Sequence, residues 1–417
     1  MPGIQVKRWL ILLLISILFV DLGLAYLLRS IYISTHGLPA WTYDATLQFI
    51  PRLYRAALFG GVGLALLAFS FVMLSRSVLG PFLPGGHRAM IDVLYDYRYR
   101  QRGPRVVAVG GGTGMSILLR GLKEYTGNLT AIFTVADDGG SSGRLRTDYS
   151  IPPPGDVRQC LTALAEAEPL MKQLFQHRFS GGGLDGHSFG NLFITAMAQV
   201  TGNFERAVQE AGKVLAVRGQ ILASTLQDVR LCAEFKDAVG SPNGAVAVVV
   251  GESSIPDHAG SISRVFLDPV RPELNPEAAL SILDCDLIVI GPGSLYTSLL
   301  PNLLVDGMVD VIKAARAPKV YVCNVADQRG ETDGFTVSDH LRVLHDHVGV
   351  NLFDYVLVNS NHAHEPTGGQ NKVIFDPVAA DQFQAHFVLA DVVNRRVPSH
   401  HDSEKLAKVI IKRIWNA

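Results

Sequence analysis

A glycine run is the strongest chemical signal in the sequence. Residues 110–114 read GGGTG, after a β-branched run at 105–109 and before a helical pattern at 115–125. Glycine lets the backbone approach an anion, and a helix N-terminus offers free N–H groups and the positive end of the helix dipole. The strand–turn–helix context therefore predicts a phosphate-binding loop. Its predicted contacts are Gly111, Gly112, Thr113 and Gly114.

This loop departs from both common nucleotide fingerprints. Met115 stands where the dinucleotide pattern G-x-G-x-x-G needs its third glycine, and the absence of G-K-[ST] excludes a P-loop. Asp137 nevertheless ends the second predicted strand, roughly where an acid holds the ribose of a bound dinucleotide. A nicotinamide-dependent oxidoreductase therefore stays open as an interpretation.

A second loop, DDGGSSGR at 137–144, combines carboxylates, hydroxyls and a guanidinium group. Asp137 and Asp138 can hold a hard cation such as Mg²⁺ that bridges phosphates, so we treat them as candidate metal ligands and catalytic groups. Alternatively, one of them accepts a hydrogen bond from a ribose or a base. The predicted phosphate contacts are Ser141 and Ser142, with Arg144 and Arg146 to neutralise charge.

Three segments farther along the chain extend the predicted site. In DGHSFGN at 185–191, His187 is a candidate acid, base or phosphate donor. GPGS at 291–294 again follows a predicted strand and repeats the anion-binding arrangement, with Thr297 as a further hydroxyl donor. The sequence NVADQ ends the next strand. The predicted ligand contacts from these segments are Asn191, Gly291, Gly293, Ser294 and Asn324.

Other polar residues have weaker signals. Asp156 precedes a helix, where the role of N-cap and a role in the site are both open. The spacing of His362 and His364 suits a metal, but no third ligand is evident. His400 and His401 read as a solvated turn. None of the four cysteines forms a CxxC pair, which favours buried thiols.

The elements that would position these loops alternate between strands and helices. Apolar strands are predicted at 105–109, 129–135, 245–250, 287–290, 319–323 and 355–358. Such alternation is typical of an α/β fold with a mostly parallel sheet and helices on both faces. Ligands bind such sheets beyond the carboxyl ends of the strands, so the polar loops are expected to meet at one edge.

The first eighty residues have a different character. Residues 9–28 and 56–74 are long apolar runs, which predict two transmembrane helices. Basic residues before the first and after the second run place both termini and the large domain in the cytoplasm, as a multi-pass membrane protein. A cleaved signal peptide is the competing interpretation of the first run, which contains Asp21. The predicted units are a membrane hairpin at 1–80, a linker at 81–104 and a nucleotide-binding domain at 105–417.

Overall charge does not indicate a nucleic-acid partner. The 417 residues include 37 Lys and Arg against 38 Asp and Glu, so the chain has no basic excess. The predicted partners are a nucleotide ligand and the membrane, and a homo-oligomer stays open.

The loops taken together resemble a known family. The segments VVAVGGGTGMSILLRGLK, FTVADDGGSSGRLR, PPPGDVRQCLTAL, GHSFGNL, LIVIGPGSLYTSLLPNLLV and VCNVADQRGETDGF occur in order between residue 105 and about residue 386. They are similar to the gluconeogenesis factor, or YvcK-like, family, which is related to CofD, the 2-phospho-L-lactate transferase. The two predicted membrane helices lie outside this resemblance.

The resemblance implies a Rossmann-like (CofD-like) parallel sheet with a nucleotide site at its carboxyl edge. YvcK-like members bind UDP-sugars such as UDP-N-acetylglucosamine and influence cell shape, envelope synthesis and growth on gluconeogenic carbon sources. It therefore implies a nucleotide-sugar-binding regulatory protein. The alternative is a Mg²⁺-dependent phosphotransferase of the CofD type, in which Asp137 or Asp138 matches an acid that touches the acceptor. ADDGGSSG at 136–143 looks like the YvcK type, so enzyme activity stays open.

Overall fold

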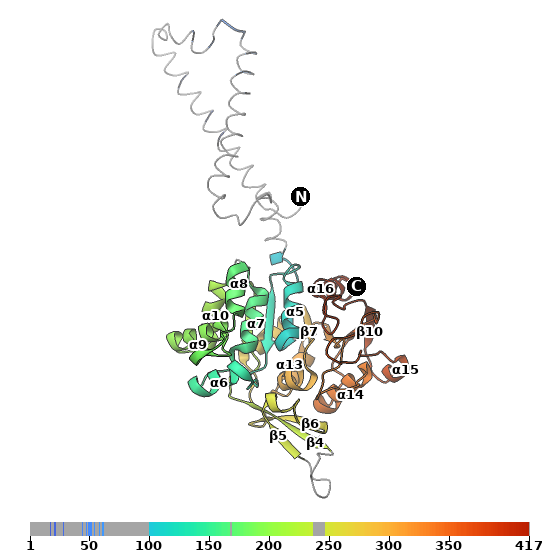
Figure 1. Cartoon of the computed structure of the whole chain (residues 1–417). Helices are drawn as coiled ribbons and strands as arrows, with labels where there is room; N and C mark the ends of the chain where they lie inside the picture. The colour runs from blue at the N-terminus through green and yellow to red at the C-terminus, as the bar shows by residue number, and fades with distance from the viewer. Residues whose placement is uncertain are drawn as a thin grey trace. The chain divides into compact units, whose positions relative to one another are not determined.

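The structure is a computed structural model that describes residues 100–166, 169–236 and 247–416, with isolated positions before residue 100. The chain divides into two compact units, Met1–Tyr99 and Arg100–Ala417. The helices and strands described below belong to the second unit (Figure 1).

Seven parallel strands form the central sheet of this unit, in the order β10-β9-β8-β7-β1-β2-β3. The chain starts in the middle at β1 and moves outward through β2 to β3. It then returns to the other side of β1 with β7 and moves outward again to β10. The strand order therefore reverses between β1 and β7, the point where open α/β sheets bind ligands. The strands are β1 Val106–Gly110, β2 Leu129–Phe133, β3 Gln220–Ala223, β7 Leu287–Ile290, β8 Lys319–Val322, β9 Tyr355–Asn359 and β10 His386–Ala390.

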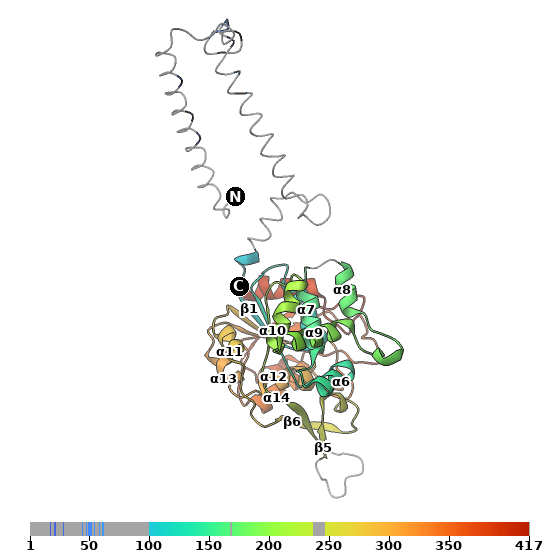
Figure 2. The ribbon, with the colours of Figure 1, turned by 90° about the vertical axis from the view of Figure 1, so that its left-hand side faces the viewer.

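Helices cover both faces of the sheet, which confirms the predicted α/β class. Every residue of β1 and β7 is buried, as expected for strands packed on two sides. Helix α5 packs against both α7 and α16, and α11 packs on α13. Figure 2 shows α11 and α13 on the opposite side from α7 and α10. These helices span α5 Gly112–Leu122, α7 Pro154–Leu164, α10 Phe204–Val214, α11 Pro276–Leu283, α13 Met308–Ala314 and α16 Ser403–Val409.

The remaining helices fill the connections. They are α6 Gly140–Tyr149, α8 Pro169–Gln176, α9 Phe189–Thr201, α12 Leu300–Leu303, α14 Val337–Val348 and α15 Pro377–Ala380. Two short 3₁₀ helices are η2 Gly182–Leu184 and η3 Glu252–Ser254, and two π-helices are η4 Leu295–Leu299 and η5 Ile410–Trp415.

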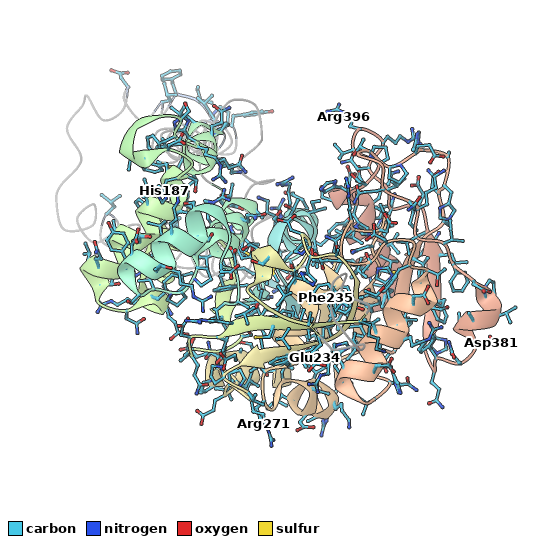
Figure 3. The ribbon with its side chains drawn as sticks, turned by 60° about the horizontal axis from the view of Figure 1, so that its bottom comes forward. His187, Glu234, Phe235, Arg271, Asp381 and Arg396 are labelled. Carbon is cyan, nitrogen blue, oxygen red and sulfur yellow. The ribbon has the colours of Figure 1, made fainter. Side chains whose placement is uncertain are left out.

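A small antiparallel sheet corrects one predicted strand. Its order is β5-β4-β6, with β4 Arg230–Lys236, β5 Ala247–Val250 and β6 Ser261–Asp268. The run at 245–250 was expected in the parallel sheet, but β5 lies at the edge of this separate sheet. Its side chains alternate between half-buried and exposed positions, because only one face is covered. On β4, Phe235 is buried, whereas Glu234 pairs with Arg264 of β6 at 2.8 Å (Figure 3).

The predicted localisation as a multi-pass membrane protein is contradicted. Of the helices that the structure describes, none is long and apolar enough to cross a bilayer. The longest, α9, has 13 residues, whereas a membrane span needs about 20. The two apolar runs at 9–28 and 56–74, apart from isolated positions, lie outside the described residues.

A capping box starts α14 and fixes the end of the loop that follows β8. The Thr336 side chain accepts a hydrogen bond from the N–H of Asp339, whose carboxylate accepts one from the N–H of Thr336. We expect Thr336→Ala to lower the free energy of unfolding by about 1 kcal/mol, because it leaves an orphan N–H at the helix start. Urea denaturation measures this change. Ser281→Ala, which removes an exposed hydroxyl bonded within α11, is the control and should change stability by less than about 0.5 kcal/mol.

Candidate functional site

Two glycine loops meet where the strand order reverses. The first joins β1 to α5, and the second, Gly291 to Ser294, joins β7 to η4. They touch so closely at Gly114 that a Cβ added there would lie 2.3 Å from the carbonyl oxygen of Pro292. The buried Asn302 amide donates to the carbonyls of Gly110, at 2.9 Å, and of Ser298, at 2.7 Å. The loops after β1 and β7 are therefore held as one rigid wall.

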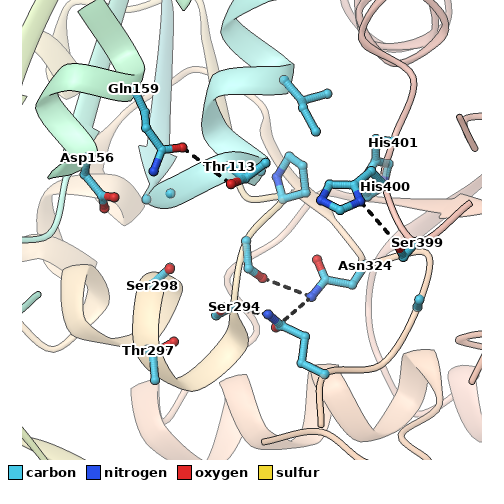
Figure 4. A pocket seen from close by; sticks show the side chains of 18 of the residues that line it. Thr113, Asp156, Gln159, Ser294, Thr297, Ser298, Asn324, Ser399, His400 and His401 are labelled. Atoms are coloured by element: carbon cyan, nitrogen blue, oxygen red, sulfur yellow. Dashed lines mark hydrogen bonds between the residues drawn. The ribbon is translucent and has the colours of Figure 1, made fainter. Parts of the chain in front are cut away.

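A cavity of about 430 Å³ opens beside these loops. Figure 4 shows Asp156 and Gln159 on one side of it and His400 with Ser399 on the other. The predicted residues that line it are Gly111, Gly112, Thr113, Gly114, Asp137, Gly293, Ser294 and Asn324. Residues far apart in the sequence thus meet at the carboxyl edge of the sheet, where we expected the polar loops.

Three carboxyl groups give the cavity an acidic wall. Burial raises the pKa of Asp156 to about 7, and the nearby charge of Asp137 adds to the shift, although the N–H of Gly112 donates to the Asp156 carboxylate. Burial also raises the pKa of Asp137. The pKa of Glu252 rises to about 8, first through burial and then through the surrounding carboxylates. Glu252 and Asp156 are therefore partly protonated near neutral pH.

A fourth carboxyl group corrects the predicted anion site of the GPGS loop. Glu331 accepts hydrogen bonds from the Thr297 hydroxyl, at 3.2 Å, and from the N–H groups of Tyr296 and Thr297. Burial raises the pKa of Glu331 to about 7. The N-terminus of η4 already holds a carboxyl group of the protein, so it is not free for a phosphate. Gly291 does not line the cavity but packs beneath the loop against Val322.

Side-chain amides form another part of the wall. The Asn324 amide donates to the carbonyl of Gly293 at 3.0 Å, and Gln328 donates to the Ser294 hydroxyl at 2.6 Å. Gln159 accepts from the Thr113 hydroxyl at 3.4 Å, and Gln370 also faces the cavity. Each amide offers both a donor and an acceptor, so this wall suits hydroxyl groups and the edge of a base.

The predicted solvated turn at His400 and His401 is wrong. His401 is buried, its Nε2 lies 3.2 Å from the carbonyl oxygen of Cys323, and burial lowers its pKa to about 4. His400 lines the cavity, with its Nδ1 3.2 Å from the Ser399 hydroxyl. No Lys or Arg is among the described residues that line the cavity, so the His400 imidazole is its main candidate to donate a hydrogen bond to a phosphate.

Several predicted site residues lie elsewhere. The Ser141 hydroxyl is 3.0 Å from Nδ1 of His187, and the Asn191 amide donates to the same hydroxyl at 3.1 Å. Arg158 donates to Asn191 at 2.9 Å. This buried network joins α6 to α9, on the helical side of the unit where Figure 3 labels His187. Ser142 is also buried and hydrogen-bonds to Asp137. Thus Ser141, Ser142, His187 and Asn191 support the loop without lining the cavity.

The two adjacent aspartates point into different cavities. Asp137 lines the cavity beside the glycine loops, whereas Asp138 lines a second one and accepts the N–H of Ser253 at 2.9 Å. Their carboxylates therefore do not meet as a pair of ligands for one ion. Among the described residues, no group of three or more His, Cys, Asp or Glu side chains is arranged to hold a metal, and this includes His362 and His364.

The two arginines of the second loop also face away from the glycine loops. Arg146 donates to the carbonyls of Val135 and Asp137 at 3.2 and 3.3 Å. Arg144 donates to the carbonyl of Asp185 at 2.8 Å. Both line the second cavity, so the expected neutralisation of a phosphate at the glycine loop does not come from them.

Comparisons with known proteins agree with the α/β fold of this unit. The family model described as 2-phospho-L-lactate transferase CofD matches residues 106–394. A Nostoc sp. protein named "Putative gluconeogenesis factor" is 45% identical over 425 residues, which cover 99% of this chain and 91% of that protein. The gluconeogenesis factor of Bacillus subtilis is 45% identical over 318 residues, which cover 74% of this chain and 97% of that protein. A crystal structure of a UPF0052 family member from Bacillus halodurans, 46% identical, has a TM-score of 0.69 and covers 74% of this chain and 99% of its own.

Proposed function

Because this chain belongs to the CofD family and is a relative of the gluconeogenesis factors, we propose that it binds a nucleotide-sugar, most simply a UDP-sugar, as a regulatory protein. Its targets would be cell shape, envelope synthesis and carbon metabolism. The observation that carries the proposal is the cavity between the loops of β1 and β7, where the strand order reverses. Nucleotides bind at such a reversal in other open α/β sheets.

The start of α5 would hold the diphosphate. The N-cap residue is Gly111, which has no side chain to cap the helix. Among the N–H groups at the start of α5, the Asp156 carboxylate accepts a hydrogen bond from that of Gly112. Within the described residues, the N–H groups of Thr113 and Gly114 have no acceptor. Unsatisfied N–H groups at a helix N-terminus are the usual backbone contacts of a phosphate.

The side chains of the cavity favour a ligand that is rich in hydroxyl groups. Asn324, Gln328 and Gln370 offer donors and acceptors, and protonated Asp156 or Glu252 can donate to a sugar oxygen. A nucleoside triphosphate would place more negative charge beside these carboxyl groups, without a lysine or arginine from the lining to balance it. A diphosphate joined to a sugar carries less negative charge than a triphosphate, and its sugar hydroxyls can hydrogen-bond to the side-chain amides. A nucleotide-sugar therefore suits this cavity better than a nucleoside triphosphate.

Isothermal titration calorimetry of the full-length protein with UDP-N-acetylglucosamine tests the proposal. We expect a saturable one-site isotherm, with UDP binding more weakly because it lacks the sugar. UTP should bind more weakly still, because of its additional charge. Failure to bind any UDP-sugar tested would refute the proposal.

His400 is expected to contribute to affinity for the nucleotide-sugar. It reaches the cavity from the segment after β10 and is its main candidate partner for a phosphate charge. We expect His400→Ala to weaken binding of UDP-N-acetylglucosamine about tenfold, a loss of about 1.4 kcal/mol. Calorimetry measures this loss. His345→Ala, at an exposed position of α14 that does not line the cavity, is the matched control and should bind as the parent does.

One observation favours phosphotransfer as a second candidate function. Glu252 titrates near neutral pH inside the cavity, as a group that transfers protons does. In this case Mg²⁺ would neutralise the diphosphate, and Asp137 and Asp156, which share the cavity wall, are the carboxylates that would hold it. Transfer moves the phosphoryl group from the conjugate to the hydroxyl of an acceptor and releases the nucleotide, so nucleotide release with Mg²⁺ and an added alcohol acceptor tests this function. If no conjugate releases a nucleotide, we keep only the binding role.

A further inference from the structure

A second cavity lies on the other side of the Asp137–Asp138 peptide. Its volume is about 1020 Å³, and its walls come from α6, from the loop between β3 and β4, and from β5. The arginines that line it are Arg144, Arg146 and Arg230. The nucleotide-binding role proposed above uses none of these side chains.

The arginines of this second cavity differ in what they contact. The Arg146 guanidinium group already has partners within the protein, since it pairs with Asp228 and donates hydrogen bonds to three backbone carbonyls. Among the residues that the structure describes, the Arg144 side chain donates only to the carbonyl of Asp185. The Arg230 side chain makes no hydrogen bond or ion pair with the part of the chain that the structure describes. Arg144 and Arg230 are both exposed, so their guanidinium groups are available to an anion.

The carboxylates of this cavity do not satisfy those two arginines. Asp228 pairs with Arg146, and Asp138 accepts the N–H of Ser253. Asp148, the remaining acid of the lining, forms no ion pair within the described ranges. An anion that contacts both guanidinium groups would therefore form charge-assisted hydrogen bonds that the protein itself does not supply.

Apolar side chains complete the wall of the second cavity. Leu226 is 55% exposed and Val250 is 51% exposed, although both line a concave surface, and Ile151 lies nearby in the same lining. Covering these side chains with an apolar group would remove their surface from water, at about 25 cal/mol per Å². The lining thus combines an anion-binding part with an apolar part.

Two short segments are shared between the cavities. In one, Asp137 faces the first cavity and Asp138 the second. In the other, Glu252 faces the first cavity and Val250 the second. The hydrogen bond from the Ser253 N–H to the Asp138 carboxylate joins the two segments. A ligand that shifts one segment would therefore move side chains of both cavities.

We propose that the second cavity binds a small organic phosphate with an apolar body, and that its occupancy changes the affinity of the first cavity for a nucleotide-sugar. The phosphate contacts Arg144 and Arg230, and the apolar body packs on Leu226 and Val250. Linkage requires the coupling to be reciprocal, so each ligand changes the affinity of the other by the same factor. The coupling rests on the proposed function, whereas binding at the second cavity does not.

Phenyl phosphate is the probe that tests this second site. Calorimetry of the full-length protein should show saturable binding of phenyl phosphate, weaker binding of inorganic phosphate and no binding of phenol. The double variant Arg144→Gln, Arg230→Gln should weaken phenyl phosphate binding about tenfold or more. Arg206→Gln, at an exposed position of α10, is the matched control and should bind as the parent does. Absence of binding, or equal binding by the double variant and the control, would overturn the site.

A second titration tests the coupling. The Kd of UDP-N-acetylglucosamine, measured with saturating phenyl phosphate, should differ at least about fivefold from its value without phenyl phosphate. Asp138→Ala, which removes the hydrogen bond to Ser253, should reduce that difference. An unchanged Kd refutes the coupling. If UDP-N-acetylglucosamine does not bind even alone, the coupling fails together with the proposed function, and the phenyl phosphate titration still decides the site.

Discussion

Gly114→Ala is expected to destroy the nucleotide-sugar site. A Cβ at this position would lie 2.3 Å from the carbonyl oxygen of Pro292 and 2.9 Å from the N of Gly293, both of them backbone atoms. Neither atom can rotate away, so the loops after β1 and β7 must separate. Steric overlap of this kind typically costs about 1–3 kcal/mol of stability. Because the same loops form the wall of the cavity, we also expect about a 100-fold loss of affinity for UDP-N-acetylglucosamine, or about 2.7 kcal/mol.

Urea denaturation and calorimetry on the same preparation separate these two effects. Gly183→Ala is the matched control, because a Cβ there meets nothing within 4 Å and the backbone is not in the left-handed region. We expect its stability to change by less than about 0.5 kcal/mol and its affinity to remain that of the parent. A Gly114→Ala protein that binds UDP-N-acetylglucosamine as tightly as the control would show that the contact between the two loops is not needed for binding.

The strands in the middle of the sheet were predictable from the sequence, because they are apolar throughout and buried on both faces. The predicted strand at 287–290 coincides with β7, and the one at 355–358 misses only the last residue of β9. The strands that we did not predict are β3, β4, β6 and β10. In β4 and β6, Glu234 and Arg264 face each other across the small sheet, so these strands look polar along the chain. Their stability depends on a pairing that local sequence does not reveal.

The candidate site was predictable only where the signal is local. A glycine loop between a strand and a helix reveals itself within ten residues, and Gly111 to Gly114 do line the cavity. Glu252 was not a candidate residue, although GESS at 251–254 directly follows the predicted strand at 245–250; it belongs to a short 3₁₀ helix that reaches the cavity from the small sheet. His400 comes from a segment almost 300 residues after the glycine loop. Both residues line the cavity because the fold brings distant segments of the chain together, and the local sequence does not reveal this.

For the second loop, a strong local pattern led to a wrong prediction. We expected all of its polar side chains to line one binding site. DDGGSSGR suggested that acids, hydroxyls and arginine converge on a single ligand. In a helix, however, successive residues point in different directions, and α6 starts at Gly140. Ser141 therefore turns toward His187 and α9, whereas Arg144 turns toward the second cavity. The loop separates two cavities, which motivates the proposal of a second ligand site.

The acidic wall predicts how stability should depend on pH. The pKa values of Asp156, Glu252 and Glu331 are raised by burial to about 7, 8 and 7, whereas in the unfolded chain these groups ionise near pH 4. Above pH 4 the folded state therefore binds more protons than the unfolded state, so stability falls as the pH rises, until all three groups are ionised near pH 9. His401, whose pKa is lowered to about 4, and Lys123, whose pKa is lowered by burial to about 8, have the opposite effect and offset part of this fall.

We therefore expect the free energy of unfolding of the unliganded protein to fall by about 2 kcal/mol between pH 6.5 and pH 8.5. Glu252→Gln should remove about half of this fall and make the protein more stable than the parent at pH 8.5, because a neutral amide replaces a buried charge. Urea denaturation at the two pH values measures both effects. Glu273→Gln, at an exposed position away from the cavity, is the matched control and should keep the slope of the parent. A stability that stays constant or rises over this range would mean that the carboxyl groups ionise freely, so the cavity would repel a diphosphate more strongly than the proposed function allows.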